Sequence, residues 1–473
     1  MTKLCSIVLK PVAAVSLITV GVACGSYSSP SSGAAGSSQS SGGAPDMSGG
    51  GASASSSSGG PGSSGAPSTN GGETNGGSAG SGAGPTTGGS STGGAPNSGG
   101  STASSGGAGG APASGGAPGT AGGSAAGAGG ESIPLPCDVL SGGGNKCVSA
   151  HSTVRVIVSN YSGPLYQLCK GTASAGPSSC KGTTQDIASK AGYADSAAHE
   201  AFCSGGTCTI TKIYDQSGQK NDLEPAPKGG AKGTPDNPAD ANALKVTVNG
   251  HTVYGILIKA GIGYRTGCSA CTIKTGNGMV KGDDPETMYW VTSQKDLIDG
   301  CCFDYGNAET TSNDDGNGTM ETLYFGGGVV WGTGAGGKPG PWMMADLENG
   351  LYAGWENKQD KNISTNKKLP YDFVTGLLLG DTKDKNSGKG RFVIYGGDAT
   401  SGTLQTMYDG IRPEKPGYVP MLKQGSIILG IGGDNSNSAG GRFYEGAVSV
   451  GPVISKQTAD ALQAALVAVK YGK

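Results

Sequence analysis

Short apolar runs separated by polar turns recur along the chain from residue 134 to residue 473. Residues 246–254 alternate apolar and polar side chains around Asn249 and Gly250, a pair that supplies the two positive φ angles of a tight hairpin turn. Many short strands between turn signals favour an all-β sandwich or barrel over alternating helices and strands. Further strands are predicted at residues 209–214, 287–292, 321–325, 392–395, 426–429 and 443–450.

One stretch near the end of the sequence has helical periodicity. Ser455 can cap a helix, and Leu462, Leu466 and Val469 then fall on one face of it. We expect this C-terminal helix to pack on the sheets.

Composition sets the residues before 134 apart. Gly contributes 92 of the 473 residues, and between residues 28 and 132 Met47 is the only large apolar side chain. Such a segment cannot bury enough apolar surface to offset the entropy lost on ordering it. We therefore expect residues 25–133 to form a disordered tether and residues 134–473 to form one large domain.

The first 24 residues predict export. Lys3 and Lys10 precede an apolar run at residues 11–23, which is typical of a signal peptide and too short for a spanning helix. The run ends at Ala23-Cys24-Gly25-Ser26, which resembles the bacterial lipoprotein signal in which the cysteine is lipidated, although Gly21 departs from that pattern. We expect lipidation at Cys24, with ordinary cleavage and free secretion as the alternative.

Charge and cysteine usage narrow the class of protein. The net charge is −2, with no cluster of Lys or Arg, so nucleic acid is not an expected partner. Ten of the twelve cysteines lie in the domain as close pairs, the pattern of disulfides in an exported chain. Zinc is a weaker alternative for Cys268 and Cys271, since neither a second such pair nor a nearby His completes the ligands. The predicted disulfides are Cys137–Cys147, Cys169–Cys180, Cys203–Cys208, Cys268–Cys271 and Cys301–Cys302.

Three motif matches carry no chemistry. Residues 332–337 match a dinucleotide-binding string, but Lys338-Pro339 follows and cannot open the required helix. Residues 76–80 match a serine nucleophile elbow inside the tether, without a strand or helix around it. Residues 313–317 are acidic but lack the spacing of a calcium loop, and we expect a solvated turn there.

Catalysis by carboxyl groups is the possibility that remains after these motifs are set aside. Glycoside hydrolysis needs two carboxyl groups, one to attack or activate water and one to protonate the leaving oxygen. In residues 342–349, Asp346 and Glu348 would point to the same face of a strand. In residues 427–435, an apolar strand runs into glycines, which would let a substrate approach the backbone, and then presents Asp434.

Cys301 and Cys302 are neighbours in the sequence. Adjacent Cα atoms lie about 3.8 Å apart, closer than the usual disulfide span of about 4.4–6.8 Å. A bridge between them would be a strained ring, and strain of this kind tends to persist at functional sites. Pairing with other cysteines is the alternative, but the other eight cysteines of the domain already fall into four pairs that are close in sequence.

From about residue 136 to residue 471 the chain resembles the catalytic domain of glycoside hydrolase family 54, the α-L-arabinofuranosidase B family. The strings that carry the resemblance keep their order and a similar spacing. They are Cys-Cys-Phe-Asp-Tyr-Gly-Asn-Ala-Glu-Thr at 301–310, Tyr-Asp-Gln-Ser-Gly at 214–218, Pro-Trp at 341–342 with Asp-Leu-Glu-Asn at 346–349, Ile-Ile-Leu-Gly-Ile-Gly-Gly-Asp-Asn-Ser-Asn at 427–437, Ala-His-Ser-Thr at 150–153 and Phe-Tyr-Glu-Gly at 443–446.

The resemblance implies a concanavalin-like two-sheet β-sandwich that hydrolyses glycosides with retention of configuration. Glu348 would be the nucleophile and Asp434 the acid/base, and the Cys301–Cys302 disulfide would be a platform under the sugar ring. The activity would be release of terminal α-L-arabinofuranosyl residues from plant cell-wall side chains in arabinoxylan or arabinan, by a monomer without cofactor or metal. Further positions that match sugar-contacting residues of the family are Trp331, Asp346, Asn349 and Gly433.

The sequence departs from the family in three respects. Gly350 stands where the family usually has a second Asn, which leaves the substrate contact at that position open. No β-trefoil module follows the domain within 473 residues, and the cysteine pairs 169/180 and 268/271 are additional. Two other hypotheses remain: a β-sandwich that binds carbohydrate without catalysis, and a glycosidase for another furanoside or pentoside.

Overall fold

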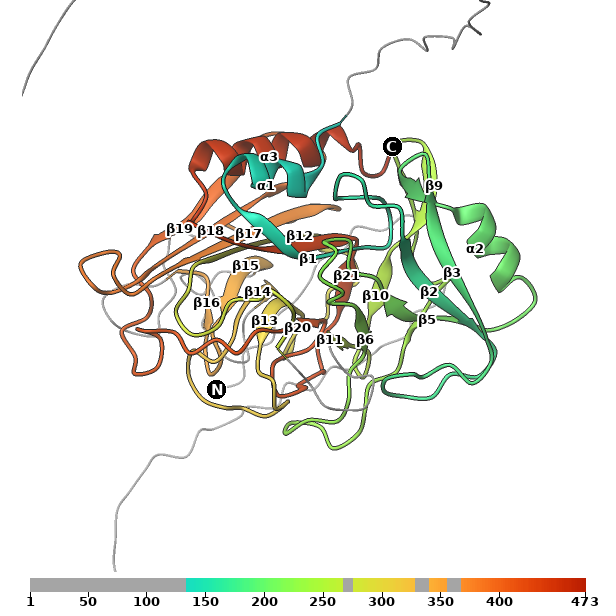
Figure 1. Ribbon diagram of the computed structural model, residues 1–473, viewed down its shortest axis with the longest axis horizontal. Helices are drawn as coiled ribbons and strands as arrows, with labels where there is room; N and C mark the ends of the chain where they lie inside the picture. The colour runs from blue at the N-terminus through green and yellow to red at the C-terminus, as the bar shows by residue number, and fades with distance from the viewer. Residues whose placement is uncertain (1–132, 267–274, 328–339, 355–366) are drawn as a thin grey trace, which may run out of the picture. The chain divides into compact units, whose positions relative to one another are not determined.

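The computed structural model describes residues 133–266, 275–327, 340–354 and 367–473 (Figure 1). The predicted signal peptide and tether with Cys24, the pair Cys268 and Cys271, Trp331 and the loop at 332–337 lie outside the described residues. Across the described ranges, no helix combines the length and the apolar character needed to span a bilayer.

One layer of the fold is a six-stranded antiparallel sheet. All eight positions of its strand Val374–Asp381 are buried, because this sheet is covered on both faces. Such strands therefore appear in the sequence as apolar runs rather than as alternating patterns. The strand order is β1 (Lys146–Ser152), β22 (Glu445–Val450), β12 (Glu286–Thr292), β17 (Val374–Asp381), β18 (Arg391–Asp398) and β19 (Gln405–Gly410).

The second sheet is longer and brings together strands that are far apart in the sequence. Its order is β16 (Leu351–Tyr352), β15 (Trp342–Asp346), β14 (Glu321–Gly326), β13 (Asp304–Ala308), β20 (Ser426–Leu429), β11 (Tyr264–Thr266), β6 (Leu223–Pro225), β5 (Cys208–Ile213), β2 (Pro164–Lys170), β3 (Thr183–Lys190) and β4 (Tyr193–Ala194), with β7 (Ala239–Asp240) paired to β5. Two ribbons complete the strands: β8 (Lys245–Val248) with β9 (His251–Tyr254), and β10 (Ile256–Ile258) with β21 (Gly441–Phe443).

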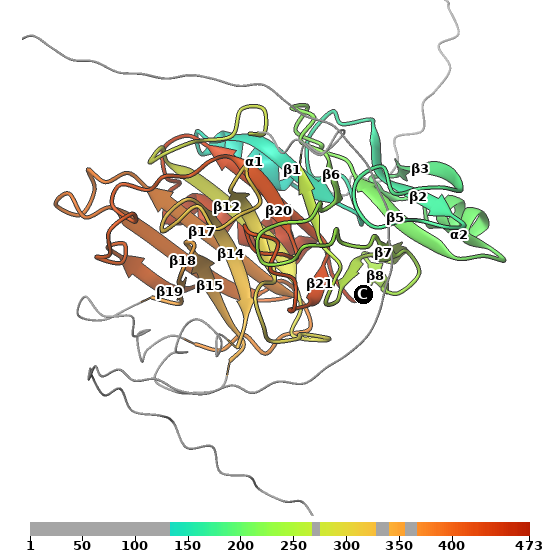
Figure 2. The ribbon, with the colours of Figure 1, turned by 90° about the horizontal axis from the view of Figure 1, so that it is seen from below.

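The two sheets pack face to face, with β14 against β17 and β15 against β18 (Figure 2). Trp290 on β12 lies in the core between them, its ring 5.0 Å from that of Phe303 between centroids. The indole N–H of Trp290 donates to Met343 Sδ on β15 at 3.3 Å, so the one polar atom of this side chain is satisfied inside the core. The predicted β-sandwich is confirmed.

The predicted terminal helix is α3 (Lys456–Ala468). Ser455 Oγ accepts from the Thr458 N–H at 3.1 Å, as expected for an N-cap. Leu462 and Leu466 are fully buried, and the helix packs on β17. With α1, α3 covers the outer face of the six-stranded sheet (Figure 1).

Two other helices, α1 (Pro136–Gly142) and α2 (Ser196–Cys203), were not predicted. They have seven and eight residues, too few to give a clear helical period. Each contains one cysteine of a local disulfide, Cys137–Cys147 or Cys203–Cys208, which fastens the helix to the following strand.

The predicted hairpin is confirmed as β8 and β9, joined by Asn249 at φ 47° and Gly250 at φ 78°. The other predicted strands agree within a few residues, except that residues 443–450 do not form one strand. The chain leaves β21 at Phe443 and enters β22 at Glu445, so it changes sheets at Tyr444.

Candidate active site

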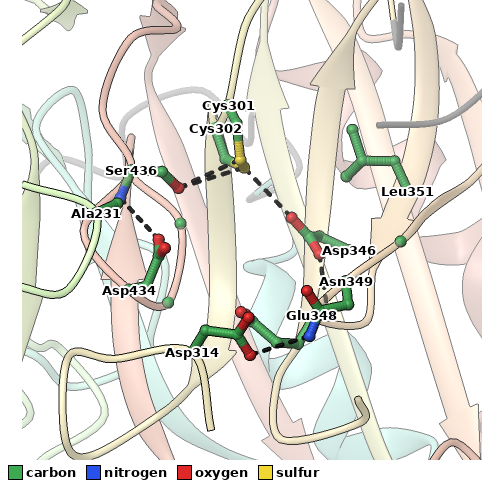
Figure 3. A pocket seen from close by; sticks show the side chains of 13 residues that line it. Ala231, Cys301, Cys302, Asp314, Asp346, Glu348, Asn349, Leu351, Asp434 and Ser436 are labelled. Carbon is green, nitrogen blue, oxygen red and sulfur yellow. Dashed lines mark hydrogen bonds between the residues drawn. A yellow bond between two sulfur atoms is a disulfide. The ribbon is translucent and has the colours of Figure 1, made fainter. Parts of the chain in front are cut away.

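A cavity of about 230 Å³ opens beside the strand ends of β15 and β20. Figure 3 shows Asp434 on one side of it and Asp346 with Leu351 on the other, with the sulfur atoms of Cys301 and Cys302 between them. Five separate segments of the chain supply its wall. The lining residues are Ala231, Cys301, Cys302, Asp314, Asp346, Glu348, Asn349, Gly350, Leu351, Gly432, Gly433, Asp434 and Ser436.

Glu348 stands on the tight turn between β15 and β16. The Leu347 N–H donates to Gly350 O at 3.2 Å across this turn. Glu348 and Asn349, at its centre, have φ angles of 59° and 57°, the pattern of a type I′ hairpin turn. Asn suits such a backbone, whereas Glu adopts it rarely, and rare backbone conformations tend to be kept at functional sites.

Contacts on both peptide groups hold this turn. The Glu348 N–H donates to Asp346 Oδ1 at 3.1 Å, and the Glu348 carbonyl accepts from the Tyr418 hydroxyl at 2.6 Å. The Glu348 residue is only 7% exposed, although it lines the cavity. The turn therefore presents a nearly buried carboxyl group to the cavity in a defined position.

Asp434 lies on the loop that follows β20. Its Oδ1 accepts from the Ser436 N–H at 2.9 Å, and its carbonyl accepts from the Ala231 N–H at 3.0 Å. The preceding Gly433 has no room for a side chain, because an added Cβ would lie 1.7 Å from Glu309 Oε2. We expected this glycine to let a substrate approach the backbone; in the structure, the Glu309 carboxyl group occupies the space that a side chain at Gly433 would fill.

Cys301 and Cys302 are joined by a disulfide. The peptide between them is cis, so their Cα atoms are 2.9 Å apart rather than the 3.8 Å assumed for a trans bond. Cys301 Sγ lies 3.2 Å from Ser436 Oγ, and Cys302 Sγ lies 3.4 Å from Asp346 Oδ2. Cys302 also packs in an apolar cluster with Trp342, so the disulfide is a wall of low polarity between the two acidic segments.

The structure also joins Cys137–Cys147, Cys169–Cys180 and Cys203–Cys208, none of which lines the cavity. Cys301, Cys302 and Asp346 bring three potential metal-ligand atoms close together. Metals bind the thiolate form of cysteine, and both sulfur atoms are engaged in the disulfide, so this group is poorly suited to a metal.

Carboxyl groups crowd the cavity. Burial raises the pKa of Glu348 well above its ordinary value, and the nearby Glu309 and Asp346 raise it further. Burial likewise raises the pKa of Asp346 and of Asp304, and the charge of Asp346 raises the pKa of Asp304 further. A raised pKa favours the neutral, protonated carboxyl group, so these acids give the cavity less negative charge than their number suggests.

The buried guanidinium of Arg265 lies beneath the cavity. It donates to the Gly433 carbonyl at 2.7 Å and to the Glu309 carbonyl at 2.6 Å. Burial lowers the pKa of Arg265 to about 10, so it remains charged at neutral pH. It ties the Asp434 loop to the end of β13 and partly offsets the negative field of the carboxyl groups.

The structure gathers every described residue of the predicted site around one cavity. Trp331 is the exception, since it lies outside the described residues. These residues are Glu348, Asp434, Cys301, Cys302, Asp346, Asn349, Gly350 and Gly433.

Sequence reasoning missed three acids. Asp304 begins β13 and Glu309 follows its last residue, inside the string at 301–310, where two acids in one short segment were the available signal. Asp314 was expected in a solvated turn and is exposed, but it also lines the cavity, and its Oδ1 accepts from Asn349 Nδ2 at 3.0 Å.

Comparison with known proteins agrees with this geometry. Residues 136–472 match the family described as "Alpha-L-arabinofuranosidase B, catalytic". A probable α-L-arabinofuranosidase B of Aspergillus fumigatus is 47% identical over 342 residues, covering 71% of this chain and 62% of the relative. An α-L-arabinofuranosidase of Hypocrea jecorina is 46% identical over 340 residues, with 71% and 63% covered. The chain thus spans less than two thirds of the length of these relatives.

Solved structures of arabinofuranosidases are also similar to this chain. A family 54 α-L-arabinofuranosidase mutant soaked with 4-nitrophenyl α-L-arabinofuranoside superposes with a TM-score of 0.63 at 42% identity, covering 71% of this chain and 66% of that one. An arabinofuranosidase complexed with arabinofuranosyl-α-1,2-xylobiose gives a TM-score of 0.62 at 41% identity, with 72% and 66% covered. The chain belongs to glycoside hydrolase family 54, the family of α-L-arabinofuranosidase B catalytic domains.

Proposed function

We propose that this chain is a retaining α-L-arabinofuranosidase that releases terminal α-L-arabinofuranosyl residues from polysaccharides such as arabinoxylan and arabinan. The observation that carries the proposal is the placement of Glu348 and Asp434 in one small cavity beside the Cys301–Cys302 disulfide. About 230 Å³ is below the usual range for drug-sized ligands and suits a single small sugar ring. The membership of family 54 supports the same substrate class.

In this mechanism Glu348 attacks the anomeric carbon while Asp434 gives its proton to the leaving glycosidic oxygen. The sugar becomes an ester of Glu348, with inverted configuration at the anomeric carbon. Asp434, now ionised, takes a proton from water, and the water oxygen displaces Glu348 with a second inversion. The product keeps the α configuration, Asp434 regains its proton and Glu348 is released as a carboxylate.

The other lining groups have roles in binding. The sulfur atoms of Cys301 and Cys302 offer an apolar surface to one face of a sugar ring. Asp346, Asn349 and Asp314 line the same cavity with polar atoms that can hold ring hydroxyl groups. Gly350 adds no side chain at a position where the family usually has Asn, so that contact is absent from the proposed site.

Azide rescue tests the two catalytic roles. Asp434→Ala should form the glycosyl-enzyme on an activated aryl α-L-arabinofuranoside and then stall, and azide, which needs no general base, should release an α-azide. Glu348→Ala should give a β-azide, because azide then displaces the leaving group directly. Asp460→Ala, at a partly exposed acid on α3 that does not line the cavity, is the control and should keep full activity. A β-azide from Asp434→Ala, or normal turnover by Glu348→Ala, would reverse or remove these assignments.

A panel of aryl glycosides tests the substrate. One relative, from Trichoderma koningii, is named an arabinofuranosidase/B-xylosidase and is 46% identical over 340 residues, so another pentoside is the second candidate. The arabinofuranoside should be hydrolysed faster than the matching xyloside and galactofuranoside. A faster xyloside would favour the second candidate, and binding of arabinose without hydrolysis of any substrate would indicate a carbohydrate-binding protein.

We also propose that the chain is exported and held at the cell surface through Cys24. Disulfides among the described residues fit an oxidising compartment. A tether of about 105 flexible residues would have a root-mean-square reach of roughly 50–60 Å. Fractionation should find the wild type and a Cys5→Ala control in membranes and Cys24→Ala in the medium; equal release of all three would exclude the anchor.

A further inference from the structure

Glu309 lies between the two proposed catalytic segments. It follows directly after β13 and is not exposed at all. Its Oε2 occupies the space that a Cβ at Gly433 would fill, next to Asp434, and this buried oxygen has no hydrogen-bond partner. The Glu309 carboxyl group also interacts electrostatically with that of Glu348. Glu309 therefore lies next to the loop that carries the acid and acts on the residue that should attack.

This pair needs a proton. If Glu309 and Glu348 were both ionised, neither carboxylate could donate a hydrogen bond to the other. The buried Glu309 Oε2 would then have no hydrogen-bond partner. One proton between the carboxyl groups turns the contact into a hydrogen bond. That proton cannot stay on Glu348 during catalysis, because a neutral carboxyl group is a poor nucleophile.

Thr319 gives the proton another place to go. Its Oγ1 lies 2.7 Å from Glu309 Oε1 and 2.6 Å from the Gly316 carbonyl oxygen. The hydroxyl has a single hydrogen, and the carbonyl can only accept. When Thr319 donates to Gly316, its own lone pair is free to accept from a protonated Glu309. The chain Glu309–Thr319–Gly316 can thus hold a proton on Glu309 and leave Glu348 ionised.

We propose that Glu309 is a positioning residue that takes the proton of the pair when Glu348 attacks and that holds the ionised Glu348 toward the anomeric carbon. The inference rests on the proposed function of Glu348. The proton moves from Glu348 to Glu309 as the sugar enters, the Glu348 carboxylate forms and later breaks its ester bond, and the proton is again shared when the product leaves. Each proton is conserved within the site.

Other charged groups surround the pair and set the background against which it titrates. Asp346 and Asp314 raise the pKa of Glu348, and Arg265 opposes the rise for Glu309. All of them remain in the test variants, so a change in pH dependence reports on the pair itself. The groups that face it are Asp304 on β13, Asp346 on β15, Asp314 on one loop, Asp434 on another, Arg265 on β11 and the Tyr418 hydroxyl.

Glu309→Gln is the central test. The amide cannot ionise, and its N–H can donate to Glu348, as a protonated Glu309 would. Removal of the like charge should lower the pKa of Glu348, so the acid limb of kcat/KM should move down by about one pH unit or more, with turnover retained. Thr319→Val should do the opposite, raising the acid limb and lowering kcat with little change in KM, and Thr319→Ser should restore both. An exposed control, Glu200→Gln on α2, should change neither.

An infrared titration makes the result independent of turnover. In the wild type, a protonated carboxyl band should persist at neutral pH and be reduced in Glu309→Gln, at unchanged melting temperature. An unshifted acid limb together with an unchanged band would overturn the role of Glu309, whatever the activity. A reduced band in a protein that hydrolyses no arabinofuranoside would retain the proton-sharing pair and overturn the proposed function instead.

Discussion

A single methyl group at Gly433 should disable the site through Glu309. In Gly433→Ala the new Cβ would lie 1.7 Å from Glu309 Oε2 and 2.5 Å from its Cδ, whereas ordinary contact begins at 3.4 Å. Gly433 is not among the glycines with positive φ, so the backbone itself tolerates alanine. The whole effect should come from the collision.

The geometry sets the size of the effect. The Glu309 carboxyl group must retreat by about 1.7 Å to restore ordinary contact. It is buried, so it cannot swing into solvent, and the movement breaks its contacts with Thr319 and Glu348. Overpacking of this kind costs about 1–3 kcal/mol, a fall of roughly 1–4 °C in Tm for a domain of this size. Displacement of a catalytic group by about 1 Å can cost on the order of 100-fold in kcat/KM.

Thermal melts and aryl arabinofuranoside kinetics would measure both effects. Gly233→Ala is the matched control, because an added Cβ there meets nothing within 4 Å. In a Glu309→Ala background the obstacle is gone, so Gly433→Ala should cost at least about 1 kcal/mol less than in the wild type. Additive Tm losses in this double-mutant cycle, or a fully active and stable Gly433→Ala, would refute the reasoning.

Three further predictions concern groups around the cavity. Replacing Cys301 and Cys302 together by Ala should impair binding or turnover with little loss of Tm, because the loop that the disulfide closes is minimal; a large Tm loss with normal kinetics would contradict this. Folding raises the pKa of Asp346 to about 7 and also raises the pKa of Asp304, so the stability that these acids contribute is present below about pH 4 and is lost as pH rises, for Asp346 through about 7. Asp304→Asn should therefore gain Tm relative to the wild type in that window, and an unchanged difference between pH 4 and 8 would refute it. Asp314→Asn should lower the acid limb of kcat/KM slightly at low salt and less at high salt. The reason is that the exposed Asp314 raises the pKa of Glu348, and salt screens charges at the surface. A shift that does not depend on salt would point to a steric cause.

Local patterns predicted the elements that depend on local chemistry. Asn249 and Gly250 specify their hairpin through backbone angles that few other residues adopt, and Ser455 specifies the start of α3 through one hydrogen bond. The helix α1 begins at Pro136 and ends before Gly143, but its seven residues are too few for a helical period, and a disulfide and packing on α3 hold it. The change of sheet at Tyr444 could not be predicted either, because it depends on pairing with β10 on one side and with β1 and β12 on the other.

The candidate site likewise contains residues that the sequence predicted and residues that it did not. Glu348 and Asp434 were found because family strings contain them, but the sequence does not say that 85 intervening residues bring them into one cavity. Asp304 and Glu309 were overlooked because an acid in a short strand more often faces solvent. Their burial follows from the position of β13 between β14 and β20, which is a property of the assembled sheet.

The strand order β15–β14–β13–β20 fixes the spacing between the strands that lead to the two proposed catalytic residues. The strands that lead to Glu348 and Asp434 are three steps apart, and each step is about 4.8 Å because backbone hydrogen bonds fix it. Insertions in the surrounding loops can reshape the entrance of the cavity without changing the spacing of these strands. Homologues with this ladder should therefore diverge in the polymers they accept long before they diverge in anomeric stereochemistry.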